Sequence, residues 1–271
     1  MTMPAQTISP SLARTLLRAT GWCGLGLIAI AVALSDFLAR APAGAVGMGA
    51  MLEAPSADHP FGTDLLGRDL LSETLHGLSV TTIHALIAAL VAIILGGLAG
   101  AVAARLPRPL GQSARGIIGV FAAVPALLIA IIIIGLSSRG LAPLAAGLAA
   151  APLAFVRAFD RVDTQSSHAY YARASGIAAA TLLRRDLIYE FRDTLASVAA
   201  RALAAVTIIL STVSFLGFGA TPPARDLGLM IAAAKTTYLS AWWTASFPAV
   251  ALIALIFFAR MAAGLEEGER P

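Results

Sequence analysis

Two short segments of this chain gather side chains that could do chemistry, although only 13% of all residues are charged. The first runs from His59 to Asp69 and combines an imidazole, carboxylates and a guanidinium group. The second covers residues 157–193 and is rich in arginine. Such groups pair with charges and hydrogen-bond to partner surfaces. The composition of the first segment assigns it no function beyond a structured surface, whereas the second, as a charged island between long apolar blocks, is expected to lie in water and to contact a partner.

Motifs for catalysis, nucleotide binding and metal binding are missing from the sequence. There is no G-x-x-x-x-G-K-[ST] phosphate loop, no H-E-x-x-H and no G-x-S-x-G. The four histidines, His59, His76, His84 and His168, have no ligand spacing, and Cys23 is the single cysteine. We therefore expect no enzyme activity and no cofactor or metal in this chain.

The elements that position these segments are long apolar blocks. The chain has 271 residues, of which 58% are hydrophobic, and blocks of roughly 20 apolar residues are long enough to cross a bilayer. We expect a single all-α, polytopic membrane domain over residues 1–271. Six transmembrane helices are predicted, at about 20–38, 78–104, 116–136, 141–158, 196–217 and 241–262.

The distribution of arginine predicts the orientation of these spans. With the N-terminus inside, thirteen of the nineteen basic residues lie in cytoplasmic segments and five in outer segments. This is the bias of the positive-inside rule, so both termini are expected in the cytoplasm. It also explains the basic character of the chain, and no nucleic-acid partner is expected. An alternative interpretation of residues 14–41 as a cleaved secretory signal would leave five spans.

The two large water-facing pieces are then an outer loop, about 39–77, and a cytoplasmic loop, about 159–195. In the outer loop, Phe61-Gly62 is predicted to form a turn, and Thr63 or Asp64 to cap a helix. Arg68 can pair with Asp64 at i, i+4. The candidate residues of this outer motif are Phe61, Gly62, Thr63, Asp64, Gly67, Arg68 and Asp69.

The cytoplasmic loop is predicted to form two short helices around Gly176, where a left-handed turn fits. Leu183 and Leu187 lie on one apolar stripe of the second helix, and Arg184 projects elsewhere. Such a knob can enter a groove on a soluble partner. The alternative is a solvated connection. The candidate residues are Tyr170, Tyr171, Ala172, Arg173, Ala174, Gly176, Leu183, Arg184 and Leu187.

His84 lies within the second predicted span, among apolar residues. Ionisable residues inside a membrane span are candidates for function. The alternative interpretation is a structural hydrogen bond to a neighbouring helix. Gly96, Gly97 and Gly100 form a small-residue face that allows helices to approach closely, either within the chain or across an interface with a partner.

Three strings of the sequence resemble one transporter family in the expected order. The segment from His59 to Asp69 resembles H-x-F/L-G-T-D-x-L-G-R-D, which precedes the second span in permease subunits of peptide/nickel-type ABC importers. Residues 170–178 resemble the "EAA" loop of such permeases, with Tyr170 and Tyr189 at the usual Glu and Pro positions. Residues 214–223 resemble S-F-L-G-L-G-x-x-x-P, which ends the fifth span.

The resemblance implies the type I, binding-protein-dependent ABC permease fold in a bacterial cytoplasmic membrane. It implies a second homologous permease subunit, two ATP-binding subunits that hold ATP and Mg, an external solute-binding protein and membrane lipid as partners. The cytoplasmic loop would dock on an ATP-binding subunit. The solute would be a small peptide, a nickel or metal complex, or a similar molecule. A stand-alone secondary carrier and a non-transporting membrane scaffold are the alternative functions.

Overall fold

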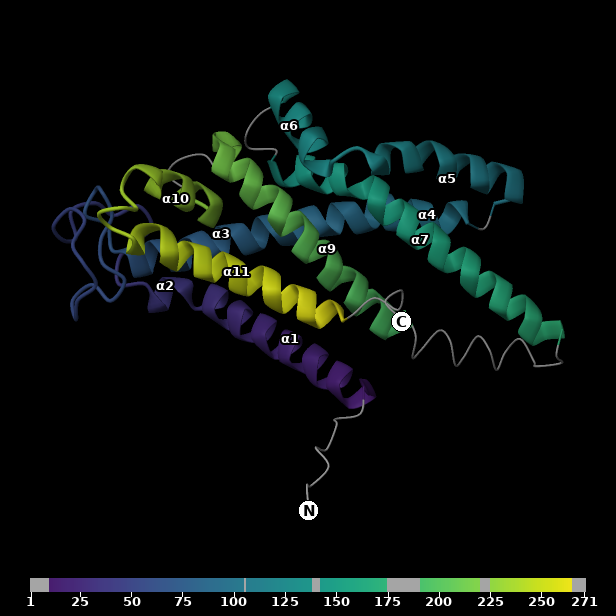
Figure 1. Cartoon of the computed structure of the whole chain (residues 1–271), viewed down its shortest axis with the longest axis horizontal. Helices are drawn as coiled ribbons and strands as arrows, with labels where there is room; N and C mark the ends of the chain where they lie inside the picture. The colour runs from purple at the N-terminus through teal and green to yellow at the C-terminus, as the bar shows by residue number, and fades with distance from the viewer. Residues whose placement is uncertain (1–9, 105, 138–141, 175–190, 220–224, 265–271) are drawn as a thin grey trace, which may run out of the picture.

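The computed structural model describes residues 10–104, 106–137, 142–174, 191–219 and 225–264. Every regular element in these ranges is a helix, apart from one isolated bridge between Thr63 and Asp69. Most of the long helices run roughly along one long axis, and the loop of residues 39–69 lies at one end beside α2 (Ser35–Leu38) and α10 (Leu227–Ala233) (Figure 1). We call this end of the bundle the loop end.

The described residues contain the following helical elements in chain order. They are α1 (Pro10–Ala33), α2 (Ser35–Leu38), α3 (Leu70–Val91), the π-helical η1 (Ala92–Leu98), α4 (Ala99–Ala103), α5 (Arg108–Ala123), α6 (Ala126–Leu136), α7 (Ala142–Ala174), α9 (Phe191–Val213), the π-helical η4 (Ser214–Phe218), α10 (Leu227–Ala233), the 3₁₀ turn η5 (Ala234–Thr236) and α11 (Trp243–Ala263).

The expected polytopic all-α membrane fold is confirmed, whereas the number of six spans is not. Four helices are long and apolar enough to cross a membrane: Thr15–Ala33, Leu70–Ala103, Ala196–Phe218 and Trp243–Ala263. A fifth crossing results if α5 and α6 count as one broken span, because they are bent by 83°. The predicted fourth span corresponds to the shorter apolar segment Ala142–Ala158 of α7.

The third predicted span, 116–136, was wrong as a continuous helix. Pro125 has no N–H to continue the helix and disfavours a helical conformation at the residue before it. Val124 accordingly has extended backbone angles, with φ −74° and ψ 133°. By contrast, Pro152 lies inside α7, which stays one helix of 33 residues. Neighbouring helices can satisfy backbone groups freed by proline in such a position.

Two helices extend beyond the predicted spans and into the predicted loops. The helix of the second predicted span begins at Leu70, within the predicted outer loop of about 39–77. The helix of the fourth predicted span does not end at 158 but continues to Ala174. The cytoplasmic loop therefore begins as a continuation of α7 and not as a separate short helix.

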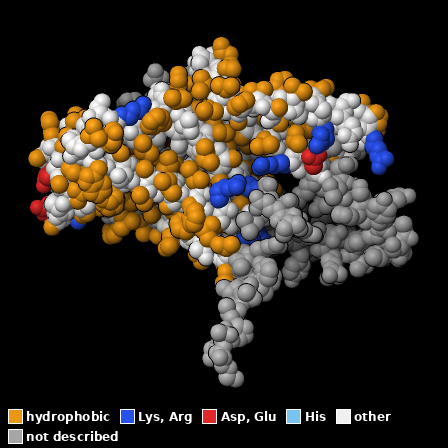
Figure 2. Space-filling model, in the orientation of Figure 1, with side chains coloured by type: hydrophobic (Ala, Val, Ile, Leu, Met, Phe, Trp, Pro, Cys, Tyr) orange, Lys and Arg blue, Asp and Glu red, His pale blue; other side chains and the backbone are white. Residues whose placement is uncertain are grey.

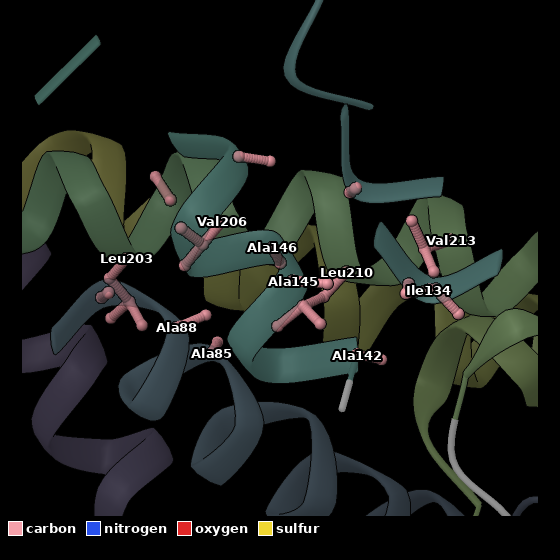
Figure 3. Close-up of a cluster of buried hydrophobic side chains, with 14 of the residues drawn as sticks. Ala85, Ala88, Ile134, Ala142, Ala145, Ala146, Leu203, Val206, Leu210 and Val213 are labelled. Atoms are coloured by element: carbon pink, nitrogen blue, oxygen red, sulfur yellow. The ribbon is translucent and has the colours of Figure 1, made fainter. Parts of the chain in front are cut away.

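A core of small side chains lies where α3, α6, α7 and α9 meet (Figure 3). Ala85 and Ala88 of α3 face Ala145 and Ala146 of α7, and all four are completely buried. Larger residues from α9, such as Val206, fill the remaining space. In a membrane, helices associate through close packing rather than through the hydrophobic effect, and small residues allow that packing.

Two glycines allow α7 to lie directly against the second span. A Cβ on Gly96 would be 2.1 Å from the carbonyl oxygen of Ala151, and one on Gly100 would be 2.2 Å from that of Phe155. Near a Cβ on Gly97, the described residues place one atom, the Cγ2 of Ile93 in its own helix, at 3.9 Å. Gly96 and Gly100 thus serve packing within the chain, as one of the two expectations had it, whereas Gly97 does not.

Hydrophobic side chains are spread over the whole described part of the face seen in Figure 2. On α3, Leu86 and Leu90 are exposed, and on α11, Val250 and Ile253 are exposed. Exposed apolar residues on long helices fit a lipid environment.

Candidate functional site

The segment from His59 to Asp69 forms a compact structure that two glycines make possible. Gly62 has φ +74°, and its N–H donates to the His59 carbonyl at 2.8 Å, which closes the predicted turn. Gly67 has φ +64°, and its N–H donates to the Asp64 carbonyl at 3.1 Å. A Cβ on either would also lie 2.5 Å from a backbone oxygen, so other residues do not fit there.

Asp69 is the N-cap of α3, which corrects the prediction that Thr63 or Asp64 caps the helix. Its side chain accepts hydrogen bonds from the Ser72 N–H at 2.9 Å and the Ser72 hydroxyl at 2.7 Å. His59 Nδ1 lies 3.0 Å from its other oxygen. Burial raises the pKa of the Asp69 carboxyl, but the hydrogen bonds from His59 and Ser72 outweigh burial, and the pKa lies below its ordinary value.

Thr63 and Phe61 attach the motif to the last span. The Thr63 side chain is fully buried, donates to the Ala50 carbonyl and accepts from the Glu53 N–H at 2.8 Å. Its backbone carbonyl accepts a hydrogen bond from Trp243 Nε1 at 3.2 Å. The Phe61 ring stacks on Phe247, with centroids 4.0 Å apart. The motif is therefore a structured cap over the loop end of α11.

Four charged side chains join the motif to the segment before α10. Arg68 Nε lies 4.0 Å from Asp64 Oδ2, which confirms the predicted pair, and Arg68 Nη1 lies 3.6 Å from Glu73 Oε2. Arg225 Nη1 lies 3.4 Å from Asp64 Oδ2 and 3.7 Å from Glu73 Oε2. Two cations and two anions thus alternate in one cluster, which links residues 161 positions apart. The sequence analysis did not identify Glu73 or Arg225.

A second polar group lies between α3, α9 and α10, and it contains His84. A small cavity there is lined by His84, Thr81, Ser211, Ser214 and Asp226, together with Ala142, Leu210 and Gly219. The Asp226 carboxylate is buried, accepts from the Ser214 hydroxyl at 2.7 Å and interacts electrostatically with His84. The Leu227 N–H donates to Thr81 Oγ1 at 3.0 Å.

Asp226 is the functional candidate that sequence reasoning missed. It caps α10, accepting from the Leu229 N–H at 2.9 Å, and so follows the common pattern of Asp at a helix start. That local signal was present in the sequence. The proximity of Asp226 to His84 could not be predicted from the sequence, because the two residues are 142 positions apart and come together through the packing of α10.

The segment after α9, which carries the third resemblance, shapes this cavity. Ser214–Phe218 is a π-helical turn, and Gly217 has φ +91°. Lys235, the single lysine, lies over the Phe215 ring at 4.2 Å from its centroid. π-Helical turns often occur at functional sites, and here the turn directs Ser214 toward Asp226.

The cytoplasmic loop lies only in part within the described residues. Tyr170, Tyr171, Ala172, Arg173 and Ala174 form the last turns of α7, for which the backbone is described. The other predicted docking residues, Gly176, Leu183, Arg184 and Leu187, lie outside the described residues. The docking role of this loop therefore stays a prediction.

An ion pair fixes α7 just before this loop. Arg115 Nε lies 2.5 Å from Asp160 Oδ1, and Arg115 Nη2 lies 3.0 Å from Asp160 Oδ2. The two parallel contacts form the bidentate geometry that orients arginine against a carboxylate. This pair joins α5 to α7 two residues beyond the apolar segment of α7.

Comparison with known proteins finds similarity to permease proteins of transport systems. No protein-family model matches the chain. The di/tripeptide transport system permease protein DppC of Pseudomonas aeruginosa is 29% identical over 241 residues, covering 87% of this chain and 77% of that protein. The probable D,D-dipeptide transport system permease protein DdpC of Escherichia coli is 27% identical over 235 residues, covering 84% and 78%. The glutathione transport system permease protein GsiD of Pectobacterium atrosepticum is 27% identical over 224 residues, covering 81% and 74%.

The chain thus resembles peptide transport system permeases over most of its length, and its described residues form four helices, or five with the bent pair, that are long and apolar enough to cross a membrane.

Proposed function

We propose that this chain, which resembles peptide transport system permeases along most of its length, is a permease subunit of an ATP-driven importer of short peptides. The observation that carries the proposal is the similarity to the di/tripeptide permease, which covers 87% of the chain. Peptides are favoured as the solute because the relatives are named for dipeptides, tripeptides and glutathione. The nickel and metal complexes expected as alternatives have no support among these relatives.

The partners follow from this role. A second homologous permease subunit would complete the pathway, two ATP-binding subunits would hold ATP and Mg, and an external solute-binding protein would deliver the peptide. We assign the complex to a bacterial cytoplasmic membrane with both termini inside. The excess of arginine in the cytoplasmic segments supports this orientation. The loop end, with the outer motif, then faces the solute-binding protein.

The helix α7 is suited to carry movement from the ATP-binding subunits into the membrane. Its 33 residues form one continuous helix, about 50 Å long at 1.5 Å per residue. Its far end begins the predicted docking loop, and its apolar half packs on α3, η1 and α6. Because such a helix moves as a rigid body, displacement at the docking loop would shift these packed helices together.

The outer motif has the properties of a rigid connection at the opposite end. It attaches the outer loop to α3 through Asp69, to α11 through Thr63 and to the segment before α10 through Arg225. We propose that the motif holds these three elements together while the pathway opens and closes. Hydrogen-bonded and paired side chains of this kind fix a geometry more than they add stability.

Co-purification with reconstitution tests the proposal. The chain is extracted from its native host in mild detergent with a C-terminal tag, and the associated proteins are identified by mass spectrometry. We expect a second permease and subunits with phosphate-binding loops, and ATP-dependent peptide uptake after reconstitution. A lone chain that transports a solute in liposomes without ATP would indicate a secondary carrier. A lone chain without transport would indicate a scaffold. Either result contradicts the proposal.

A further inference from the structure

The cavity around His84 and Asp226 has the features of a binding site that the outer motif and the docking loop do not explain. It lies between α3, α9 and α10, and its volume is about 10 Å³, about the minimum that holds one water-sized group. Five of its lining side chains carry hydrogen-bonding atoms: Thr81, His84, Ser211, Ser214 and Asp226. Polar clusters inside a membrane protein are costly and mark functional positions.

Ser211 indicates that this cavity is built for an additional group. Its side chain is only 7% exposed, and its hydroxyl oxygen has no hydrogen-bond partner among the residues that the structure describes. A buried hydroxyl without a partner costs about 1–3 kcal/mol relative to a satisfied one. The hydroxyls of Ser214 and Thr81, in contrast, are both engaged, with Asp226 and the Leu227 N–H. The hydroxyl oxygen of Ser211 is therefore available for a hydrogen bond to a group bound in the cavity.

The charge of the cavity selects a cation. Among the described residues that line it, Asp226 is the one carboxylate, and none is a lysine or an arginine. Arg225, the adjacent residue, is turned away toward Asp64 and Glu73. A carboxylate oxygen accepts more than one hydrogen bond, hydroxyls accept as well as donate, and imidazole provides one acceptor nitrogen when neutral. An acceptor-rich site around one negative charge fits a small hydrogen-bond donor that carries positive charge.

We propose that the cavity is a subsite for a primary ammonium group, namely the N-terminal ammonium of the transported peptide. An ammonium group has three donors and no acceptor, and the carboxylate of Asp226, the hydroxyl of Ser211 and the imidazole of His84 supply three acceptors. The volume of the cavity is about that of one such head group. This subsite rests on the proposed peptide permease function and adds the chemistry by which the membrane chain would recognise its solute.

The test measures equilibrium binding of L-alanyl-L-alanine to the assembled membrane complex, without the solute-binding protein, by titration calorimetry. N-acetyl-L-alanyl-L-alanine is the matched probe that lacks the ammonium group. We expect the free dipeptide to bind and the acetylated dipeptide to bind at least about tenfold more weakly, since a hydrogen bond to a charged group contributes about 1.5–3 kcal/mol. Equal affinity for both dipeptides, or no binding of either, would overturn the subsite.

Two variants separate binding from structure. Asp226→Asn keeps a good helix cap and an acceptor for Ser214, and we expect it to remove the preference for the free ammonium group. Asp36→Asn, at a carboxylate in α2 whose side chain is 97% exposed, is the matched control and should keep the preference. A preference that persists in Asp226→Asn would overturn the assignment.

Ser211→Ala provides the second readout. It removes a buried hydroxyl that has no partner among the described residues, so the complex should unfold at the same temperature as wild type or higher, while affinity for L-alanyl-L-alanine falls. A purely structural serine would not lower affinity. Unchanged affinity in this variant therefore contradicts the proposal. Uptake by the complete wild-type system is measured in parallel. Absence of uptake would contradict the permease function itself. Normal uptake together with equal binding of both dipeptides would contradict only the subsite.

Discussion

Replacing Gly96 by alanine should push η1 away from α7, the helix that leads to the predicted docking loop. An added Cβ would lie 2.1 Å from the Ala151 carbonyl oxygen, whereas real Cβ atoms essentially never come closer than 3.0 Å to such an atom. The helices η1 and α7 must therefore move apart by at least about 0.9 Å at this point. Insertion of extra atoms into a well-packed core costs about 1–3 kcal/mol.

Gly97→Ala is the matched control for this change. It lies on the same π-helical turn, and an added Cβ there meets only Ile93, at 3.9 Å. Both substitutions change the helix propensity by the same amount, up to about 1 kcal/mol in favour of alanine, so the difference between the two variants isolates the steric contact.

The measurement is unfolding in mixed micelles with increasing dodecyl sulfate, followed by far-ultraviolet circular dichroism, which reports the helix content. We expect the free energy of unfolding of Gly96→Ala to be lower than that of Gly97→Ala by about 1–3 kcal/mol. We also expect ATP hydrolysis to be less well coupled to peptide uptake in the Gly96 variant. Equal unfolding free energies for the two variants would refute the argument that the α7 contact depends on Gly96.

Three further predictions concern the two ends of the bundle. The pKa of Asp69 lies below its ordinary value of 3.8 in the folded chain, so its contribution to stability is complete above about pH 4 and is lost as the pH falls through the lower folded value. Hydrogen-exchange protection of residues 59–72, corrected for the intrinsic exchange rate at each pH, should therefore fall below about pH 4 in wild type, and Asp69→Ala, which removes both acceptor oxygens, should lower the protection at all pH values. Arg115→Asp should impair uptake, and the exchanged pair Arg115→Asp with Asp160→Arg should restore part of it, because the ion pair between α5 and α7 is rebuilt; no rescue would show that the pair does not position α7. Gly176→Val should abolish stimulation of ATP hydrolysis, because a β-branched residue resists the turn predicted there, and normal stimulation would exclude a docking role for that turn.

The sequence alone was sufficient for the helical membrane fold, because apolar blocks of bilayer length have few alternatives. It was less informative about where helices break. Pro125 and Pro152 both lie in apolar helical segments, yet only Pro125 ends a helix. The packing of α7 against its neighbours decides whether the helix continues through the proline, and the local sequence around a proline does not specify that packing.

The same limit applies to the candidate sites. The pair of Arg68 with Asp64 was predictable because the two residues are four positions apart. The helix cap was assigned to the wrong residue, since Thr63, Asp64 and Asp69 are all suitable capping types and only the folded loop shows that Asp69 precedes α3. Arg225 and Asp226 were not predicted as site residues, because the partners that they meet on α3 and in the outer loop are far away in the sequence.

ATP-driven peptide uptake in proteoliposomes tests the central claim most directly. The tagged chain is purified together with its associated subunits and reconstituted, with ATP on the side of the ATP-binding subunits and the solute-binding protein with labelled L-alanyl-L-alanine on the other. We predict uptake that requires ATP and the solute-binding protein and that fails when this chain is omitted. Uptake that continues without this chain, or that proceeds without ATP, would contradict its assignment as a permease subunit of an ATP-driven importer.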